Sequence, residues 1–478
     1  STLETSTTFG GGVIDMDNRF RFDDAGQIRL HAHAELANGY VLDGTSPAFV
    51  VRPDEVGFSF LGPLSGTTYA KAGETFSVEL RALNAFGNVT PNFGRETPAE
   101  KLILAETVDV SAGEPGDVVG AGTFTFDSGT NKFTNAALSY SESGYAAFIA
   151  QAESGDYLGS GDDLAETSAP LRFVPWAFAV NSSSMGDPHS AYCAAPGFSY
   201  MGQDLGMYLN FTAVNKQGAR TYNYEGAEAV ARARVFVTDP DSSHADLSAR
   251  LDGAPIAIDW TLGEGAASSM SVNFARDTMP DGPYAGLQYA VAIEHREVLN
   301  DAALGALVLP TQPANAYPYA TLPACVSGGT VCDAVAVAEP IEMLFGKLVL
   351  ADTYGPEDSA APVNLEVHYW NESTQQFTRH AADNCTAVDF DNLVMQESLG
   401  SAAKAGDGEI NVDRGRSPTG ALRWSAPLVE GSFTFSYTAP AWLKDEDGND
   451  PTARATFGRY RGHDRILSWQ LLPLPPED

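Results

Sequence analysis

Apolar and polar residues alternate along much of this chain, and a period of two predicts β-strands. Phe76 to Ala82 and Met207 to Ala213 are two such runs. Gly, Asn, Asp and Pro recur between the runs at spacings of about 8 to 12 residues, which is typical of the turns in antiparallel sandwiches. Helical periodicity is weak throughout. The pattern therefore predicts an all-β protein built from antiparallel β-sandwiches.

An internal repeat marks where modules begin. Residues 57–62 (GFSFLG) resemble residues 197–202 (GFSYMG), and an alternating strand follows each of them. Each strand runs into the same turn, with matching residues at Asn84, Gly87, Thr90 and Asn92 in the first copy and at Asn215, Gly218, Thr221 and Asn223 in the second. Such a turn fits a hairpin loop in which Gly takes a positive φ and Asn caps the turn with its own side chain.

A second repeat marks where modules end. Residues 22–26 (FDDAG), followed by apolar positions 28, 30, 32 and 34, resemble residues 140–144 (YSESG), followed by positions 146, 148, 150 and 152. Downstream, Thr45-Ser46-Pro47 matches Thr167-Ser168-Ala169. We therefore expect residues 1–56 to be the C-terminal half of a sandwich module and residues 57–180 to be a complete Ig-like module. Residues 181–340 then form a sandwich-like module with insertions, and residues 341–478 form a larger C-terminal β domain.

Composition and charge narrow the possible partners. The 478 residues suggest about three domains at roughly 150 residues each. With 62 acidic and 28 basic residues the net charge is −34, so the field of the protein repels nucleic acid and anionic membranes. The longest apolar run, residues 173–180, is far below the roughly 20 residues of a membrane-spanning helix. We expect neither a nucleic-acid partner nor a transmembrane segment.

The four cysteines predict disulfides rather than a metal site, because no C-x-x-C pair is present. Cys325 and Cys332 enclose a short Gly-centred span that one bridge could close, which leaves Cys193 to pair with Cys385. Such bridges persist in an oxidising compartment. The chain begins at Ser1 without a basic and apolar leader, so we expect that a signal peptide, and an N-terminal part of the protein with it, has been removed.

Several stretches between about residues 135 and 470 resemble the MshQ-like proteins, which are associated with the mannose-sensitive haemagglutinin type IV pilus of Gram-negative bacteria. The most specific match is the C-terminal string from Pro451 to Gly458 with Tyr460-Arg-Gly462 and Ile466. Earlier matches include Phe198-Ser-Tyr-Met201 and Asn384-Cys-Thr386. The resemblance implies a surface protein associated with a pilus and secreted through the periplasm. Lys347, residues 351–361 and the terminal residues 473–478 depart from the pattern.

An acidic segment near the C-terminus is the best candidate for a metal site. Asp445, Asp447 and Asn449 place oxygen side chains at alternate positions around Gly448, an arrangement that a hard cation such as calcium can use. The segment is not an EF-hand, because the glycine is fourth in the run and no Glu follows at position twelve. The alternative is a solvated acidic turn before Pro451.

Other candidate residues have more ordinary interpretations. His31 and His33 share one face of a predicted strand and are expected to face solvent rather than hold a metal, with Leu30, Ala32 and Ala34 on the core face. Arg459 and Arg461, together with Arg454 and Arg465, form a basic concentration that either pairs with the acidic turn or recognises an anionic ligand or a pilin partner. The six tryptophans are expected in cores, although a lectin role would need one exposed: Trp176, Trp260, Trp370, Trp424, Trp442 and Trp469.

No catalytic motif appears, neither a nucleophile elbow, nor a phosphate-binding loop, nor an H-E-x-x-H helix. We therefore predict a non-enzymatic, extracellular structural or adhesive protein of a pilus, whose stalk of sandwiches presents a C-terminal recognition domain. Its partners would be pilus subunits and surface glycans. One alternative is a filament subunit that polymerises through strand complementation. A second is a secreted glycan-active enzyme with accessory sandwiches.

Overall fold

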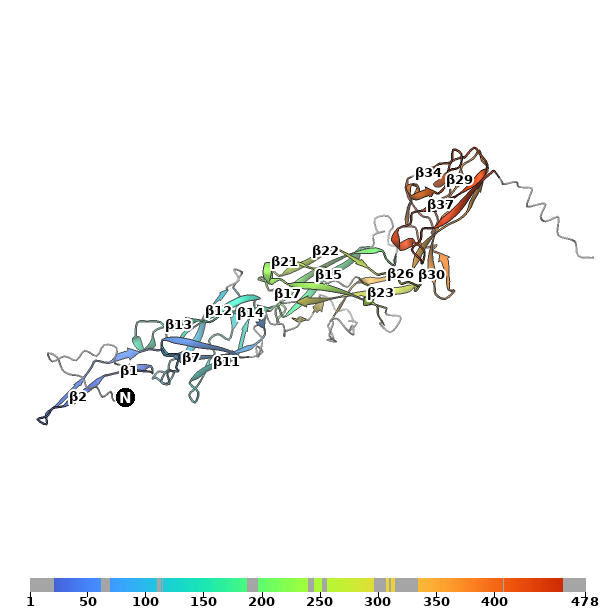
Figure 1. Ribbon diagram of the computed structural model, residues 1–478. Coiled ribbons are helices and arrows are strands. Elements are labelled where there is room, and N and C mark those ends of the chain that lie inside the picture. Colours follow the sequence, from blue (N-terminus) through green and yellow to red (C-terminus); the bar gives the residue numbers. More distant parts are fainter. Residues whose placement is uncertain are drawn as a thin grey trace, which may run out of the picture. The chain divides into compact units, whose positions relative to one another are not determined.

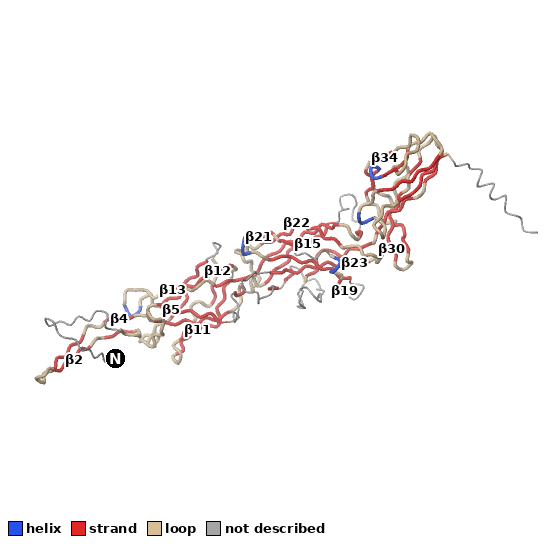
Figure 2. Tube along the Cα trace, viewed as in Figure 1, coloured by secondary structure: helices blue, strands red, loops and turns tan. Residues whose placement is uncertain are grey.

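The computed structural model describes residues 21–61, 69–109, 113, 115–186, 197–239, 245–251, 256–295, 307–308, 311–313, 334–406 and 408–458. Strands and loops account for nearly all of these residues, as Figure 2 shows. Helical structure among them is limited to five single 3₁₀ turns: Tyr157–Gly159, Gly226–Glu228, Ser248–Arg250, Phe390–Asn392 and Ala441–Leu443. The predicted all-β class of tandem Ig-like sandwiches is confirmed.

By contacts the chain divides into two compact units. Unit 1 contains Ser1–Phe178, Thr212–Ala229 and Trp260–Glu264. Unit 2 contains Ala179–Phe211, Val230–Asp259 and Gly265–Asp478.

The complete sandwich of unit 1 has two sheets, which Figure 1 colours from blue to cyan. The first sheet has the order β10 (Thr125–Asp127), β11 (Lys132–Tyr140), β7 (Phe76–Leu83), β5 (Glu55–Leu61), with β9 (Val118–Val119) also on β11. The second has the order β13 (Ala165–Thr167), β12 (Gly144–Ala152), β14 (Leu171–Val174), β6 (Tyr69–Lys71), with β8 (Leu102–Asp109) also on β12.

The period of two decides which side chains form the core of this sandwich. On β7 the buried residues are Phe76, Val78, Leu80 and Ala82, while their neighbours are only half-buried. They pack in one cluster with buried residues of the second sheet, among them Phe148 of β12. Alternation along each strand therefore gives each sheet one apolar face, and the two faces meet.

The predicted Asn–Gly turns are confirmed in both copies. Asn84 Oδ1 accepts hydrogen bonds from the backbone N–H of Phe86 and Asn88, at 3.0 and 3.1 Å, and Gly87 has a φ of 74°. Asn215 Oδ1 accepts from the N–H of Gln217 and Ala219, both at 3.0 Å, and Gly218 has a φ of 83°. The side chain of Asn thus closes the turn, and only Gly fits the left-handed position without strain.

The predicted half-module near the N-terminus contains two small antiparallel pairs. Strand β1 (Gly26–Ile28) pairs with β4 (Phe49–Val51), and β2 (His31–Glu35) pairs with β3 (Val41–Thr45). The end repeat is confirmed in detail here: Leu30 N donates to Ser46 Oγ at 2.9 Å, as Phe148 N donates to Ser168 Oγ at 3.0 Å. The same sequence therefore builds the same strand connection twice.

Two further sheets follow β14 along the chain, and both are shown in Figure 1. One has the order β21 (Asp259–Thr261), β22 (Glu264–Asn273), β17 (Asp204–Val214), β15 (Ala177–Gly186), β25 (Thr311–Pro313). The other has the order β16 (Phe198–Tyr200), β26 (Val335–Leu344), β23 (Tyr284–His295), β18 (Ala231–Asp239), β19 (Ala245–Asp246), with β20 (Ile256–Ala257) on β18 and β24 (Leu307–Val308) on β23.

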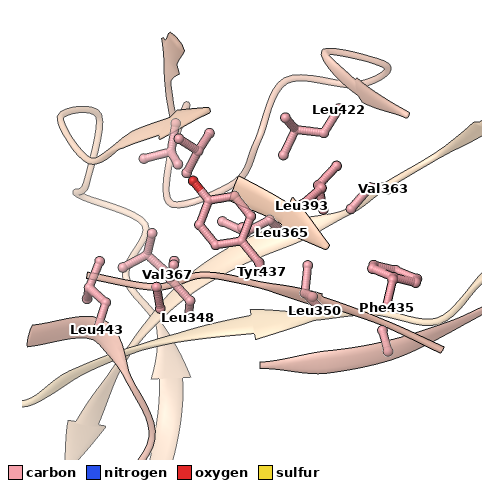
Figure 3. Packing of buried hydrophobic residues seen from close by; sticks show 14 of the residues in the cluster. Leu348, Leu350, Val363, Leu365, Val367, Leu393, Leu422, Phe435, Tyr437 and Leu443 are labelled. Atoms are coloured by element: carbon pink, nitrogen blue, oxygen red, sulfur yellow. The ribbon is translucent and has the colours of Figure 1, made fainter. Parts of the chain in front are cut away.

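The C-terminal domain in unit 2 is a differently built β domain, whose small sheets share one core. One sheet has the order β27 (Gly346–Leu350), β30 (Leu365–Asn371), β31 (Gln376–Arg379), and another has the order β28 (Thr353–Gly355), β38 (Thr452–Phe457), β37 (Gly431–Tyr437), β33 (Leu393–Met395). A third has the order β29 (Ala361–Pro362), β36 (Leu422–Trp424), β34 (Lys404–Gly406). The remaining sheet pairs β32 (Ala387–Asp389) with β35 (Glu409–Asn411). Leucines and valines of these strands converge on Phe435 and Tyr437, as Figure 3 shows. This core also contains Trp424, and Phe198 and Tyr200 of β16 contribute to it.

Candidate functional site

A fully buried polar cluster lies where β16 meets the loop between β31 and β32, within unit 2. The hydroxyl of Tyr200 donates a hydrogen bond to Asp383 Oδ2 at 2.8 Å, and its oxygen lies 2.8 Å from Nδ1 of His380. Thr386 Oγ1 donates to the same carboxylate oxygen at 2.6 Å. The backbone N–H groups of Cys385 and Thr386 donate to Asp383 Oδ1, both at 2.9 Å. Four donors therefore converge on one carboxylate.

The electrostatics of this cluster follow from its burial. Tyr200 and Asp383 have no exposed surface, and His380 is 6% exposed. Burial lowers the pKa of His380, although the Asp383 carboxylate beside it acts in the opposite direction. Burial and the neighbouring Asp383 raise the pKa of Tyr200 well above its usual range. A site this closed cannot meet a substrate, so its chemistry is structural: it ties β16 to the C-terminal core.

Sequence reasoning did not identify this cluster, because buried polar residues follow no periodic pattern. The available signal was the family resemblance, since Phe198-Ser-Tyr-Met201 and Asn384-Cys-Thr386 both belong to it. These two segments are about 180 residues apart, and they meet at Asp383.

The three residues proposed as calcium ligands lie together in one turn. Asp445 Oδ1 accepts hydrogen bonds from the N–H of Asp447 and Asn449, at 3.0 and 2.6 Å. Partial burial raises the pKa of Asp445, but the hydrogen bonds from Asn449 and Asp447 outweigh it and the pKa is lowered overall. Across the described part of the chain, no group of three or more His, Cys, Asp or Glu side chains is placed to hold a metal ion.

Two lysines form ion pairs with the acidic turn. Lys347 Nζ lies 3.3 Å from Glu446 Oε2, and Lys444 Nζ lies 3.3 Å from Asp450 Oδ1. Arg454, which was expected to pair with these acids, instead donates to Ser432 Oγ at 2.6 Å. Arg459 and Arg461 lie outside the described residues, so their proposed role in recognition stays a prediction.

The two histidines of β2 face solvent, as predicted. His33 Nδ1 lies 2.6 Å from Asp43 Oδ1 on β3, and both histidine side chains are more than half exposed. The expected core face opposite them is not buried, however, because Leu30 and Ala32 are also exposed and Ala34 is only half-buried. The predicted burial of that face is wrong for the described residues.

Core placement of the tryptophans is confirmed for Trp424 and Trp260, which are buried. Trp176, Trp370 and Trp442 are half-buried, and Trp469 lies outside the described residues. Two lysine side chains approach the ring of Trp176. The ammonium nitrogens of Lys71 and Lys216 each lie 5.1 Å from its centroid.

Of the cysteines, Cys385 lies in the described part and is buried. Cys193, Cys325 and Cys332 fall outside it, so both predicted disulfide pairings stay predictions. Within the described residues, no helix is long and apolar enough to cross a membrane.

Comparison with known families places these domains in order along the chain. Residues 49–136 match the second domain of DUF6701, residues 142–313 match the third, and residues 344–470 match the fourth. The chain carries three consecutive domains of the DUF6701 family. The buried Tyr200–Asp383 bond therefore links the third DUF6701 domain to the fourth. No curated protein matches the chain.

Solved structures give only weak likenesses to these DUF6701 domains. The I67–I69 fragment of titin has 6% identity and a TM-score of 0.27, with 84% of this chain and 97% of that fragment covered. Domains 4–9 of the surface layer protein SbsC have 10% identity and a TM-score of 0.16, with 85% of this chain and 48% of that chain covered. Scores this low do not establish a shared fold, and the sandwich assignment rests on the strand topology above.

Proposed function

We propose that this DUF6701 chain is an extracellular structural or adhesive protein of a pilus, in which tandem sandwiches form a stalk that presents the C-terminal domain. The observation that supports it is the construction of the chain: β modules that share a repeated turn are followed by a differently built β domain with its own core. Tandem Ig-like domains suit a structural or adhesive surface protein, because a row of cores holds a terminal module at a distance.

The chemistry of the surface agrees with this role. A net charge of −34 keeps such a protein soluble and away from anionic lipid and nucleic acid. The buried polar groups Tyr200, His380 and Asp383 hold the third and fourth domains together. A non-enzymatic function follows from the proposal, with pilus subunits and surface glycans as partners.

Immunogold electron microscopy of producing cells tests the proposal, with antibody raised against residues 181–478. Label at fibre ends is expected for a tip adhesin. Label repeating along the shaft would favour a filament subunit, and label absent from surface fibres would contradict both. Antibody against residues 57–180 serves as the matched control for accessibility of the stalk.

The filament alternative concerns the half-module formed by β1 to β4. In the complete module, β12 pairs with β8 along one edge and with β13 and β14 along the other. In the half-module, β3 takes the place of β13 and β4 takes the place of β14. Among the described residues no strand takes the place of β8. A preceding segment of the same protein or a strand from a neighbouring chain could complete this edge. Removal of residues 1–20 should then leave monomers, and unchanged polymerisation would count against it.

Calcium at Asp445, Asp447 and Asn449 is a further part of the proposal. The expected result is a rise in melting temperature on addition of calcium that chelator reverses and that Asp447→Asn abolishes. Asp391→Asn, at an exposed aspartate elsewhere in the same domain, is the control. A melting temperature that chelator does not change would contradict calcium binding at this turn.

A further inference from the structure

The two sequence repeats of this chain, one at module starts and one at module ends, contact each other in the structure, and they do so twice. In the first contact, Asn84 Nδ2 donates to the backbone oxygen of Asp23 at 2.9 Å. In the second, Asn215 Nδ2 donates to the backbone oxygen of Ser141 at 3.1 Å. Asp23 and Ser141 are matching positions of the end repeat, and Asn84 and Asn215 are matching positions of the start repeat.

An acidic side chain completes each contact in the same way. Asp24 Oδ1 accepts from the N–H of Asn92 at 2.9 Å and from that of Ala25 at 2.8 Å. The equivalent Glu142 Oε1 accepts from the N–H of Asn223 at 3.2 Å and from that of Ser143 at 2.8 Å. The longer glutamate makes one additional contact, because its Oε2 accepts from the N–H of Tyr222 at 2.9 Å.

We infer that the Asn-x-x-Gly-x-x-Thr-x-Asn turn is a socket for the acidic end of the preceding module, so that one recurring joint connects successive modules of this chain. The socket has two parts. The first Asn uses its oxygen to close its own turn and its Nδ2 to hold the backbone of the preceding module. The last Asn offers its backbone N–H to the carboxylate of that module. Both copies of the joint lie within unit 1.

The geometry of the turn explains why the spacing is fixed. The threonine of the motif is buried in both copies, and its N–H and Oγ1 both donate to the oxygen of the strand residue eight positions earlier. These are Thr90 to Ala82, at 3.0 and 3.1 Å, and Thr221 to Ala213, at 2.9 and 3.2 Å. The threonine thereby anchors this segment of the turn. The asparagine two residues later then presents its backbone N–H to the carboxylate.

The two joints differ in burial. Glu142, Asn215 and Asn223 are buried, whereas Asn92 is exposed and Asp24 and Asn84 are half-buried. The second joint has supporting contacts, since Gln217 Nε2 donates to the oxygen of Gly73 at 3.2 Å. Lost hydrogen bonds cost more when the remaining partners are shielded from water. Loss of Glu142 should therefore loosen its joint more than loss of Asp24 loosens the other.

Substitution of Asn215 can remove the contact across the joint while keeping the contacts that close its own turn. Asn215→Asp keeps Oδ1, which closes the turn, but places a second carboxylate oxygen, without a proton to donate, against the backbone oxygen of Ser141. Spin labels on unnatural amino acids at Thr130 and Leu262, on exposed loops on either side of the joint, report the distance distribution in the complete chain. We expect a distribution at least twofold broader in Asn215→Asp and in Glu142→Ala than in the wild type.

Asn210→Ala is the matched control, because Asn210 bonds to Ser182 at 2.8 Å on a neighbouring strand and takes no part in the socket. Its distribution should equal that of the wild type. Unchanged widths in both Asn215→Asp and Glu142→Ala, with circular dichroism of both variants unchanged, would overturn the joint. If Glu142→Ala fails to fold, Asn215→Asp alone decides. The joint is a property of the chain itself and does not depend on the proposed surface function.

Discussion

The hydroxyl of Tyr200 and the carboxylate of Asp383, 183 positions apart in the chain, share a hydrogen bond of 2.8 Å in a place that water does not reach. Tyr200 belongs to the third DUF6701 domain and Asp383 to the fourth. A bond to a buried carboxylate is stronger than one between neutral groups, and its loss leaves the buried Asp383 carboxylate with one donor fewer. This bond is therefore a sensitive point of attachment for the C-terminal core.

Replacing Tyr200 with Phe should destabilise the C-terminal core by about 1–3 kcal/mol, because Asp383 Oδ2 would keep Thr386 and lose its other hydroxyl donor. Hydrogen exchange of the β37 amides in the complete chain measures the opening free energy. Tyr208→Phe, which removes a hydroxyl from a tyrosine that is 48% exposed, should change nothing. Equal protection in Tyr200→Phe and wild type would show that the bond contributes no stability.

Acidification should weaken the same core through His380. Burial holds the native pKa of His380 below the ordinary value of 6.5. Between that value and the lowered native pKa, the unfolded chain binds a proton that the native chain does not, so stability is full above pH 6.5 and is lost as the pH falls through the native pKa. Urea unfolding at pH 7.5 and 5.5, followed by pulsed hydrogen exchange of β37, measures the loss. His380→Gln should show a smaller loss than wild type, and an equal loss would contradict the assignment.

The sequence predicted the local features of this fold far better than its long-range contacts. The turns at Asn84 and Asn215 were predicted because Asn and Gly act on their own neighbours, and the alternation on β7 depends only on the strand itself. The partners of Tyr200 and Glu142 were not predicted, because a residue that bonds across 80 or 180 positions has no local signature. The end repeat did hold a hint, since Asp24 and Glu142 keep an acid at the same position.

Gly346 should not tolerate a side chain, because a Cβ there would lie 2.4 Å from Tyr200 Cδ1 and 2.7 Å from Leu443 Cδ2. Overpacking of this kind costs about 1–3 kcal/mol, so Gly346→Ala should lower the opening free energy of the C-terminal core by that amount. Gly44→Ala is the control, since no atom lies within 4 Å of its Cβ position. A Gly346→Ala chain as stable as wild type would mean that the β16 segment can shift away from β27.

The last prediction concerns equivalent residues in the two copies of the end repeat. Phe148 and Leu30 occupy matching positions, yet Phe148 is 0% exposed and Leu30 is 41% exposed; Leu164 and Leu42 likewise differ, at 1% and 57%. The difference arises because β12 has β8 beside it and a facing sheet above it, whereas no described strand covers β1 and β2. Phe148→Ala should therefore cost about 3–5 kcal/mol, as expected for emptying a packed core.

Leu30→Ala gives a different result according to what covers the edge. If the half-module stays uncovered, the substitution should change stability by less than about 0.5 kcal/mol and leave the mass in solution unchanged. If a neighbouring chain supplies the missing strand, Leu30 is buried in the assembly, and Leu30→Ala should shift oligomers toward monomers in light scattering across a dilution series. His31→Ala, at the neighbouring exposed position where β2 begins, is the control. Oligomers that persist in Leu30→Ala would exclude this edge as the polymerisation site.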